Sequence, residues 1–165
     1  MIVVSDSSPI IALSLISQLD LLKALYGKVE VPQAVYQEVT QLGVDHIGVH
    51  EILEASWISA RSIRNDALVN ALLGELDIGE AEAITLATEV GAELLLIDER
   101  RGRKAATRLG LHVIGVLGIL IEAKKQGLID SVRQQLDALV LIAGFRISPL
   151  LRLKALEVVQ ELDEQ

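Results

Sequence analysis

The chain has 165 residues, of which 51% are hydrophobic, so it is long enough to bury one full core and short enough to form one domain. It contains no cysteine, which excludes disulfides, thiolate metal sites and a cysteine nucleophile. A net charge of −8 argues against nucleic-acid binding by the surface as a whole. No basic leader precedes the first apolar stretch, and the longest uncharged runs are too short to span a bilayer, so we expect a soluble, unprocessed, cytoplasmic protein with no membrane partner.

Strands and helices are expected to alternate through the first half of the chain. After the first apolar run, Ser8 can cap a helix whose first residue is Pro9. The segment from 43 to 79 has a weaker pattern than its neighbours. We expect strands over residues 2–5, 29–31 and 57–59, and helices from Pro9 onward and over residues 32–42, 47–55 and 66–73.

The second half repeats a strand, helix, strand pattern, which implies right-handed parallel crossovers. We expect strands over residues 94–97 and 112–114, and helices over residues 80–90, 101–109, 117–125, 130–142 and 149–162. The fold class is therefore α/β, a three-layer α/β/α domain with a mainly parallel central sheet. We expect one domain over residues 1–165, with residues 130–165 as a helical extension at its C-terminal end.

Acidic residues stand at the ends of the predicted strands and on two predicted helices. Asp6 and Asp98 each follow a buried strand, and the carboxyl ends of parallel strands meet at one edge of a sheet. Capping of the next helix is the ordinary explanation for either one alone. Glu38 lies on the flank of its helix, where glutamate is usually solvated. Glu80 and Glu82 lie in a first helical turn, and helical phase leaves open which of them faces the cleft.

Carboxylates gathered at one edge repel each other. Two of them about 4 Å apart cost roughly 1 kcal/mol in water and about 4 kcal/mol at an effective dielectric of 20. Such a group therefore needs a divalent cation or shared protons. Ligands that are all oxygen favour Mg²⁺ or Mn²⁺, so the sequence predicts a site for one of these ions.

A basic run directly follows Asp98. It consists of Arg100, Arg101, Arg103 and Lys104, with Arg108 one turn further on. Such a run is usually a solvated helix face, but its place beside Asp98 makes phosphate contact an equal expectation. Aromatic residues are only 2% of the chain, so an extended stacking platform for single strands is not expected.

Several enzyme classes lack their motifs in this chain. It has no Gly-x-Ser-x-Gly elbow, no Walker loop and no Gly-x-Gly-x-x-Gly fingerprint. These absences argue against a serine hydrolase, a P-loop NTPase and a dinucleotide-dependent dehydrogenase.

Five stretches of the chain, taken in order, resemble the PIN-domain ribonucleases, and in particular the VapC-like toxins of prokaryotic toxin–antitoxin pairs. The resemblance covers most of residues 1–125. Each stretch is loose by itself, but the order and separation of the five are fairly specific. The matching stretches are VSDSSPIIAL at residues 4–13, VPQAVYQEV at 31–39, LDIGEAEAI at 76–84, LLIDERRGR at 95–103 and GVLGIL at 115–120.

The resemblance implies a metal-dependent endoribonuclease whose acidic pocket holds Mg²⁺ or Mn²⁺. By position, Asp6, Glu38, Glu82 and Asp98 match the catalytic and metal-binding acids of the family, with Glu80 as the alternative to Glu82. Ser8 matches a small hydroxyl residue that supports metal-bound water. The resemblance also implies that Arg100, Arg101, Arg103 and Lys104 face RNA and that a small antitoxin protein is a partner. The C-terminal helices carry apolar residues that can pack on this domain or on a second subunit, so a homodimer is expected; these residues include Leu150, Leu153, Leu156 and Val159.

Two other interpretations of the acidic residues stay open. A receiver-like or haloacid-dehalogenase-like phosphotransfer domain also places aspartates at strand ends with Mg²⁺, although the Asp-x-Asp start of the dehalogenase group is missing. The other interpretation is a non-catalytic interaction module in which the acids are structural. RNA cleavage separates the ribonuclease hypothesis from both. An acid-labile phosphoaspartate would identify the phosphotransfer domain, and absence of Mn²⁺ binding would favour the interaction module.

Overall fold

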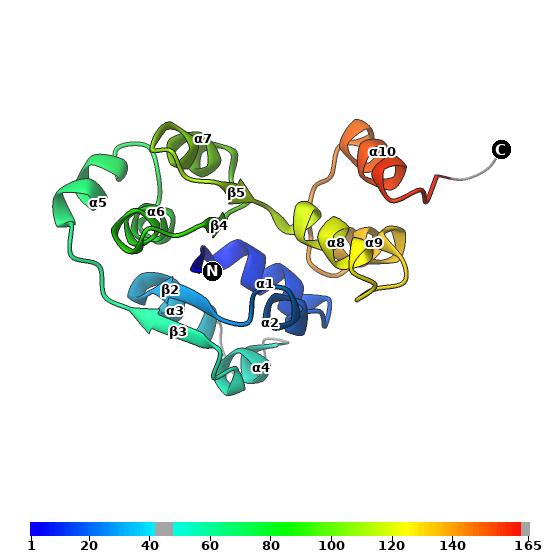
Figure 1. Cartoon of the computed structure of the whole chain (residues 1–165), viewed down its shortest axis with the longest axis horizontal. Helices are drawn as coiled ribbons and strands as arrows, with labels where there is room; N and C mark the ends of the chain where they lie inside the picture. Colours follow the sequence, from blue (N-terminus) through cyan, green and yellow to red (C-terminus); the bar gives the residue numbers. More distant parts are fainter. Residues whose placement is uncertain (42–47, 163–165) are drawn as a thin grey trace.

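A computed structural model describes residues 1–41 and 48–162 of the chain. Figure 1 shows its strands near the centre of the molecule, with helices packed around them. The strands are β1 (Val3–Ser5), β2 (Val29–Pro32), β3 (Ile58–Arg61), β4 (Leu94–Leu96) and β5 (Val113–Ile114). The helices are α1 (Ser7–Leu15), α2 (Asp20–Tyr26), α3 (Gln33–Thr40), α4 (Val49–Glu54), α5 (Asp66–Leu72), α6 (Ile78–Val90), α7 (Arg100–Arg108), α8 (Val116–Lys125), α9 (Val132–Leu141) and α10 (Pro149–Val158).

The five strands form one parallel sheet in the order β3-β2-β1-β4-β5. The chain builds outward from β1 in one direction through β2 and β3, and then returns to the other side of β1 for β4 and β5. Strand order therefore reverses between β1 and β4. In open parallel sheets this reversal opens a crevice at the carboxyl ends of the strands, where ligands bind. The predicted three-layer α/β/α fold with a mainly parallel sheet is confirmed.

Alternate residues of the central strands point to opposite faces of the sheet, as the pleat requires. Val4 and Ile97 pack in a cluster with side chains of α5, α6 and α7, and we call this side the α6 face. Val3 and Leu96 pack in a second cluster with side chains of α1, α8 and α9, and we call that side the α8 face. Both faces are therefore covered by helices, which explains why these strands are continuously apolar.

Most predicted elements occur in the structure, with shifted ends. Helix α1 begins at Ser7, so Asp6 stands at the N-cap position that the sequence analysis assigned to Ser8. Helix α2 was not predicted, because residues 20–26 carry little beyond a short apolar repeat. Two predicted helix ends, Leu42 and Ile47, lie outside the described residues. In the described part of the chain, no helix is both long and apolar enough to cross a membrane.

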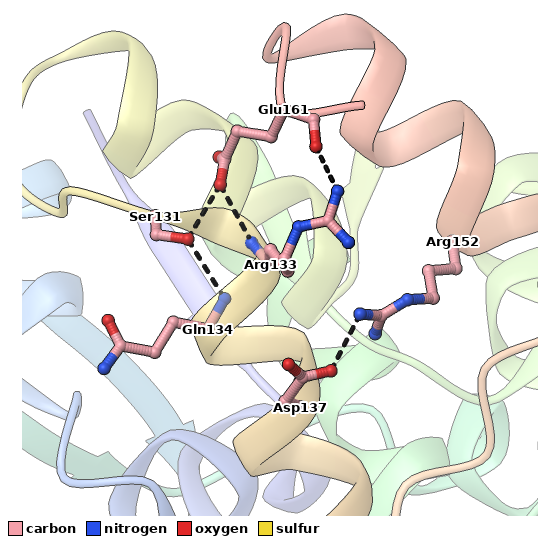
Figure 2. A network of polar contacts seen from close by, with 6 residues as sticks. All are labelled: Ser131, Arg133, Gln134, Asp137, Arg152 and Glu161. Atoms are coloured by element: carbon pink, nitrogen blue, oxygen red, sulfur yellow. Dashed lines mark hydrogen bonds and ion pairs between the residues drawn. The ribbon is translucent and has the colours of Figure 1, made fainter. Parts of the chain in front are cut away.

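The last helix is fixed to α9 by a compact polar network (Figure 2). The carboxylate of Glu161, just past α10, accepts hydrogen bonds from the Ser131 hydroxyl at 2.7 Å and from the backbone N–H of Val132 at 2.7 Å. A second bond ties Arg152 of α10 to Asp137 of α9 at 2.7 Å. Glu161 thus satisfies free N–H groups at the start of α9, which would otherwise need water.

The C-terminal helices α9 and α10 continue from α8, at the opposite end of the molecule from α5 (Figure 1). Ala155 and Leu156 are the buried residues of α10, whereas Leu150 and Leu153 are more than half exposed. The apolar packing of α10 on the rest of the chain therefore rests on few residues, and the polar network adds to it.

Candidate functional site

The candidate site lies where β1 ends beside β4. The ladder between these strands continues for one bond past β1, since the N–H of Asp6 donates to the carbonyl of Leu96 at 2.9 Å. This bond fixes the backbone of Asp6 at the strand end. The Asp6 side chain is only 4% exposed and makes no capping hydrogen bond to α1, so simple helix capping does not account for it.

Six carboxylates line a pocket of about 360 Å³ at this strand end, together with two serines and one arginine. Gly79, in the first turn of α6, lies among them. A Cβ built on Gly79 would stand 3.3 Å from Oε2 of Glu38, 3.5 Å from Oδ1 of Asp6 and 3.5 Å from Oδ1 of Asp77. Three carboxylate oxygens thus converge on the space that a side chain would otherwise fill. The lining residues are Asp6, Ser7, Ser8, Glu38, Glu75, Asp77, Glu80, Glu99 and Arg101; we call this hollow the acidic pocket.

Hydrogen bonds hold several of these acids in place. The hydroxyl of Ser7 donates to Oε2 of Glu38 at 2.5 Å, which links the start of α1 to α3. Asp77 and Glu80 form a capping box at the start of α6, because the Glu80 N–H donates to Asp77 at 2.8 Å and the Asp77 N–H donates to Glu80 at 3.2 Å. Glu80 therefore has a structural role as well as a place in the acidic pocket.

Burial and mutual repulsion raise the free energy of the fully ionised pocket. The pKa of Asp6 is raised to about 7, mainly by burial; the N–H of Ser7 opposes the rise, and the charges of Asp77, Glu80 and Glu38 add to it. Burial also raises the pKa of Glu80, with the Asp77 N–H opposing and nearby acids adding to the rise. Around neutral pH the pocket therefore holds a shared proton or needs a compensating cation.

Asp98 does not line the acidic pocket, although it follows the strand next to Asp6. Its Oδ1 accepts a hydrogen bond from the N–H of Val116, the first residue of α8, at 2.9 Å. Oδ2 is buried and has no hydrogen-bond partner among the described residues. Burial raises the pKa of Asp98, whereas the Val116 N–H and the Arg103 guanidinium lower it.

The pleat explains this separation. Ser5 pairs with Leu96, so Asp6 falls beside Ile97 on the α6 face. Asp98 is one residue further on, and a shift of one residue moves a side chain to the opposite face. The strand ends do bring Asp6 and Asp98 to one edge of the sheet, but their carboxylates line different hollows.

The sequence left open whether Glu80 or Glu82 faces the cleft, and the structure places only Glu80 there. Glu80 is 7% exposed and lines the acidic pocket, whereas Glu82 is partly exposed and does not line it. Glu38 lines the pocket from α3, and Ser8 lines it from α1. The structure thus brings together Asp6, Glu38, Glu80 and Ser8, and leaves Glu82 and Asp98 outside this group.

The predicted basic residues all lie on α7, directly after β4. Arg100, Arg101 and Lys104 are exposed, while Arg103 is partly buried and its guanidinium donates to the carbonyl of Ile97 at 3.4 Å. Arg101 lines the acidic pocket, and the whole set lines a second, larger hollow beside it. A phosphate placed at the acidic pocket would therefore lie near Arg101.

Four lining residues were not predicted: Ser7, Glu75, Asp77 and Glu99. Asp77 carries a sequence signal, because Asp-x-x-Glu before an apolar run marks a capping box. Glu99 could have been found by strand alternation, since it has the same parity as Ile97, which lies on the Asp6 face. Ser7 and Glu75 reach the pocket through tertiary packing, for which the sequence holds no local signal.

The donor set fits a hard divalent cation. The side chains that line the acidic pocket offer oxygen from carboxylates and hydroxyls, with no imidazole or thiolate among them. Three of these carboxylate oxygens face the space around Gly79, and a divalent ion held by them would lie there. As they stand, the described residues include no group of three or more acids or histidines already closed into a ligand set.

Comparison with known families agrees with this geometry. A family model described as a PIN domain (DUF3368) matches residues 2–161, which is nearly the whole chain. No match was found among curated proteins. PIN domains are generally nucleases, and therefore hydrolases. The all-parallel sheet and the pocket at its switch point match this class, so the chain belongs to the PIN-domain family.

Proposed function

We propose that this protein is a metal-dependent endoribonuclease whose active site is the acidic pocket. The observation that carries the proposal is the convergence of the carboxylate oxygens of Asp6, Glu38 and Asp77 on the space beside Gly79. Membership of a nuclease family supports the reaction class, hydrolysis of a phosphodiester bond. A receiver-like phosphotransfer domain is no longer supported, because the family match covers the chain from residue 2 to residue 161.

In this proposal Asp6, Glu38, Asp77 and Glu80 hold Mg²⁺ or Mn²⁺. When bound, the ion would polarise the scissile phosphate and make water a better nucleophile near neutral pH. Asp6 gives up the proton that its raised pKa retains in the ion-free pocket, so ion binding releases protons. Ser7 orients Glu38 through its hydrogen bond, and Ser8 lies at the pocket wall, where it can hold a water.

RNA contact is assigned to the cations of α7. Arg101 lines the acidic pocket itself, and Arg100, Arg103 and Lys104 lie on the same helix. Phosphate oxygens are the usual partners of such side chains, and these contacts position a strand without reading its sequence. Within this scheme we give Asp98 a positioning role, since it contacts the first N–H of α8 and lies beside Arg103.

The resemblance to VapC-like toxins supports a further part of the proposal, in which this nuclease is the toxin of a two-protein pair. A small antitoxin would then mask the acidic pocket, and a homodimer would cover exposed apolar residues such as Leu141 and Leu153 on α9 and α10. Growth arrest on expression of the wild type, but not of Asp6→Asn, would support the toxin role. Light scattering of the purified chain measures its oligomeric state.

The test of the nuclease proposal is cleavage of a single-stranded RNA with Mg²⁺ or Mn²⁺, with and without chelator, and with a DNA of the same sequence as control. We expect Asp6→Asn to lose more than about 100-fold in rate, as expected when a metal site loses a ligand. Cleavage that survives chelation, or an Asp6→Asn variant as active as the wild type, would overturn the proposal.

A matched pair of variants separates the two acids on α6. Glu80→Gln keeps the capping box, because glutamine serves at this position, but it removes a charge from the acidic pocket. Glu82→Gln makes the same chemical change on the same helix outside the pocket. We expect Glu80→Gln to weaken Mn²⁺ binding in calorimetry roughly 10- to 100-fold and Glu82→Gln to bind as the wild type does. The reverse order would restore Glu82 as the ligand.

A further inference from the structure

A second hollow of about 1040 Å³ lies between α7 and the C-terminal segment. Its apolar residues include Ile114, Leu117 and Ile121, from β5 and α8, and Leu139 of α9. The cations of α7 line it from one element, while the loop residues Phe145 and Arg146 line it from the C-terminal segment. We call this hollow the α7–α10 groove. Its volume is at the upper limit of pockets that enclose one small ligand, so it has room for more than one nucleotide.

The groove adjoins the acidic pocket. Glu75 and Arg101 line both hollows, and Asp98 lines the groove at the end of β4. A chain molecule held at the acidic pocket can therefore extend into the groove past Arg101. The groove is thus placed as a continuation of the proposed active site.

Positive charge is concentrated here in an otherwise acidic protein. The groove is lined by five cations from α7 and by Arg146, six of the 15 lysines and arginines in a chain of net charge −8. Arg108 is engaged by Glu75 at 2.5 Å and Arg103 by the carbonyl of Ile97. Arg100, Lys104 and Arg146 make no hydrogen bond or ion pair with the part of the chain that the structure describes, so they can bind an anion.

We propose that the α7–α10 groove binds the single-stranded RNA that flanks the cleaved bond, an inference that rests on the proposed nuclease function. The phosphates lie against the cations of α7 and Arg146, and the bases lie on the apolar floor. A single strand matches this surface because every nucleotide carries both an anion and an apolar face. A duplex keeps its base faces stacked inside, so it cannot use the floor.

An acidic protein segment is the other occupant with matching charge, and continuity with the acidic pocket favours RNA over it. A substrate strand that is cleaved at the acidic pocket must continue past the residues that the two hollows share, whereas a protein that masks the pocket can cover it without entering the groove. The proposal also gives the C-terminal helices a function. Phe145, half-buried and tied through its N–H to Leu139 at 2.9 Å, is positioned to stack on a base, and Arg146 to contact a phosphate.

The experiment measures binding of fluorescent RNAs of increasing length to the full chain by anisotropy, in an Asp6→Asn background that prevents cleavage. We expect Arg146→Glu to weaken binding of long RNA and to lower the slope of log affinity against log salt by about one or more. Phe145→Ala should weaken it roughly five- to 150-fold, the range for loss of one stacked base. Lys125→Glu makes an equal charge reversal on exposed α8 surface outside the groove and serves as the control.

Turnover separates this inference from the nuclease proposal. In the active protein, Arg146→Glu should lower kcat/KM for long RNA by a larger factor than it lowers kcat/KM for a dinucleotide. Arg146 is exposed, so its reversal leaves the fold intact, and thermal unfolding checks this. If wild type cleaves RNA but Arg146→Glu and Phe145→Ala bind and cleave long RNA as Lys125→Glu does, the groove is not the RNA path and an acidic protein segment becomes its occupant. If wild type cleaves nothing, the nuclease proposal itself fails.

Discussion

The hydroxyl of buried Ser7 donates a 2.5 Å hydrogen bond to the carboxylate of Glu38, a residue that is otherwise exposed on α3. An exposed glutamate samples many rotamers, and fixing one of them costs entropy. The hydrogen bond from Ser7 already holds one rotamer of Glu38 in the folded protein, so ion binding does not have to fix it. The same bond keeps Glu38 Oε2 close to Gly79 and Asp6. Ser7 therefore preorganises the acidic pocket without having to contact an ion.

We expect Ser7→Ala to lower Mn²⁺ affinity by roughly 10- to 100-fold, as loss of a supporting hydrogen bond does at metal sites. The free energy of unfolding should fall by only about 0.5–1.5 kcal/mol, because the partner carboxylate stays hydrated. Calorimetry and thermal unfolding measure the two effects. Ser7→Thr should restore affinity, and Ser59→Ala is the control, since Ser59 is exposed on β3 and does not line the acidic pocket. An equal loss in both alanine variants would contradict the positioning role.

Gly79 leaves the central space of the acidic pocket open. A substitution at Gly79 should therefore change activity without lowering stability. Gly79→Ala places a methyl group 3.3 Å from Glu38 and 3.5 Å from both Asp6 and Asp77. Alanine is favoured over glycine within a helix by up to about 1 kcal/mol, so we expect the variant to fold with an unchanged or slightly higher melting temperature. The ion should no longer fit, and RNA cleavage should be lost.

Activity assays beside thermal unfolding decide this point. A Gly79→Ala variant that is active and binds Mn²⁺ normally would show that the ion lies elsewhere in the pocket. Gly74→Ala is a suitable control, because a Cβ at Gly74 meets only the carbonyl of Ala71, at 3.7 Å.

The strand ends predicted from the sequence lie at the correct edge of the sheet, but the face on which each aspartate lies could not be predicted. Alternation within β1 and β4 places Asp6 and Asp98 on opposite faces, and only the register of the two strands reveals this. Local signals were enough for Asp6, because a buried apolar run followed by Asp marks a strand end. They could not choose between Glu80 and Glu82, since that choice depends on how α6 rotates against β1 and α3.

The other features that the sequence did not predict also depend on tertiary packing. Ser7 and Glu38 are 31 residues apart in the sequence, and no local pattern in either segment predicts their hydrogen bond. Helix α2 and the ends of most elements were missed or shifted because packing decides them more than propensity does. The C-terminal helices were predicted as an extension, but the groove that they form with α7 depends on where α10 is held.

Asp98 accepts a hydrogen bond at the start of α8, and the lack of a side chain at Gly115 leaves room for its carboxylate. A Cβ on Gly115 would lie 2.6 Å from Oδ1 of Asp98 and 2.9 Å from Nη1 of Arg103, so Gly115→Ala must push the carboxylate away from Val116. We expect Gly115→Ala and Asp98→Ala each to lower the free energy of unfolding by about 0.5–2 kcal/mol, the range for a lost helix cap. Asp98→Asn keeps an acceptor for the Val116 N–H and should unfold near the wild-type temperature. Loss of Mn²⁺ binding in Asp98→Asn would instead make Asp98 a ligand.

Protonation of Asp6 stabilises the acidic pocket, so the stability of the ion-free protein should depend on pH. Burial first, and then the charges of Asp77, Glu80 and Glu38 against the opposing Ser7 N–H, raise the pKa of Asp6 from its ordinary value of 3.8 to about 7. Between these two values the folded state binds more protons than the unfolded state does. Stability of the ion-free protein therefore falls as the pH rises from about 4 to about 7 and levels off above that.

Asp6→Asn removes the titrating group, so the variant should not lose stability as the pH rises. At one pKa unit per about 1.36 kcal/mol, the ionised Asp6 costs on the order of a few kcal/mol above pH 7, so the variant should melt above the wild type there and close to it near pH 4. Saturating Mn²⁺ should reverse the order by stabilising only the wild type, since an ion that binds the folded state raises its stability. Melting curves of both proteins at several pH values, with and without Mn²⁺, check both statements. An Asp6→Asn variant that melts below the wild type at pH 8 without metal would show that Asp6 stabilises the fold, and the strain expected of an ion site would be absent.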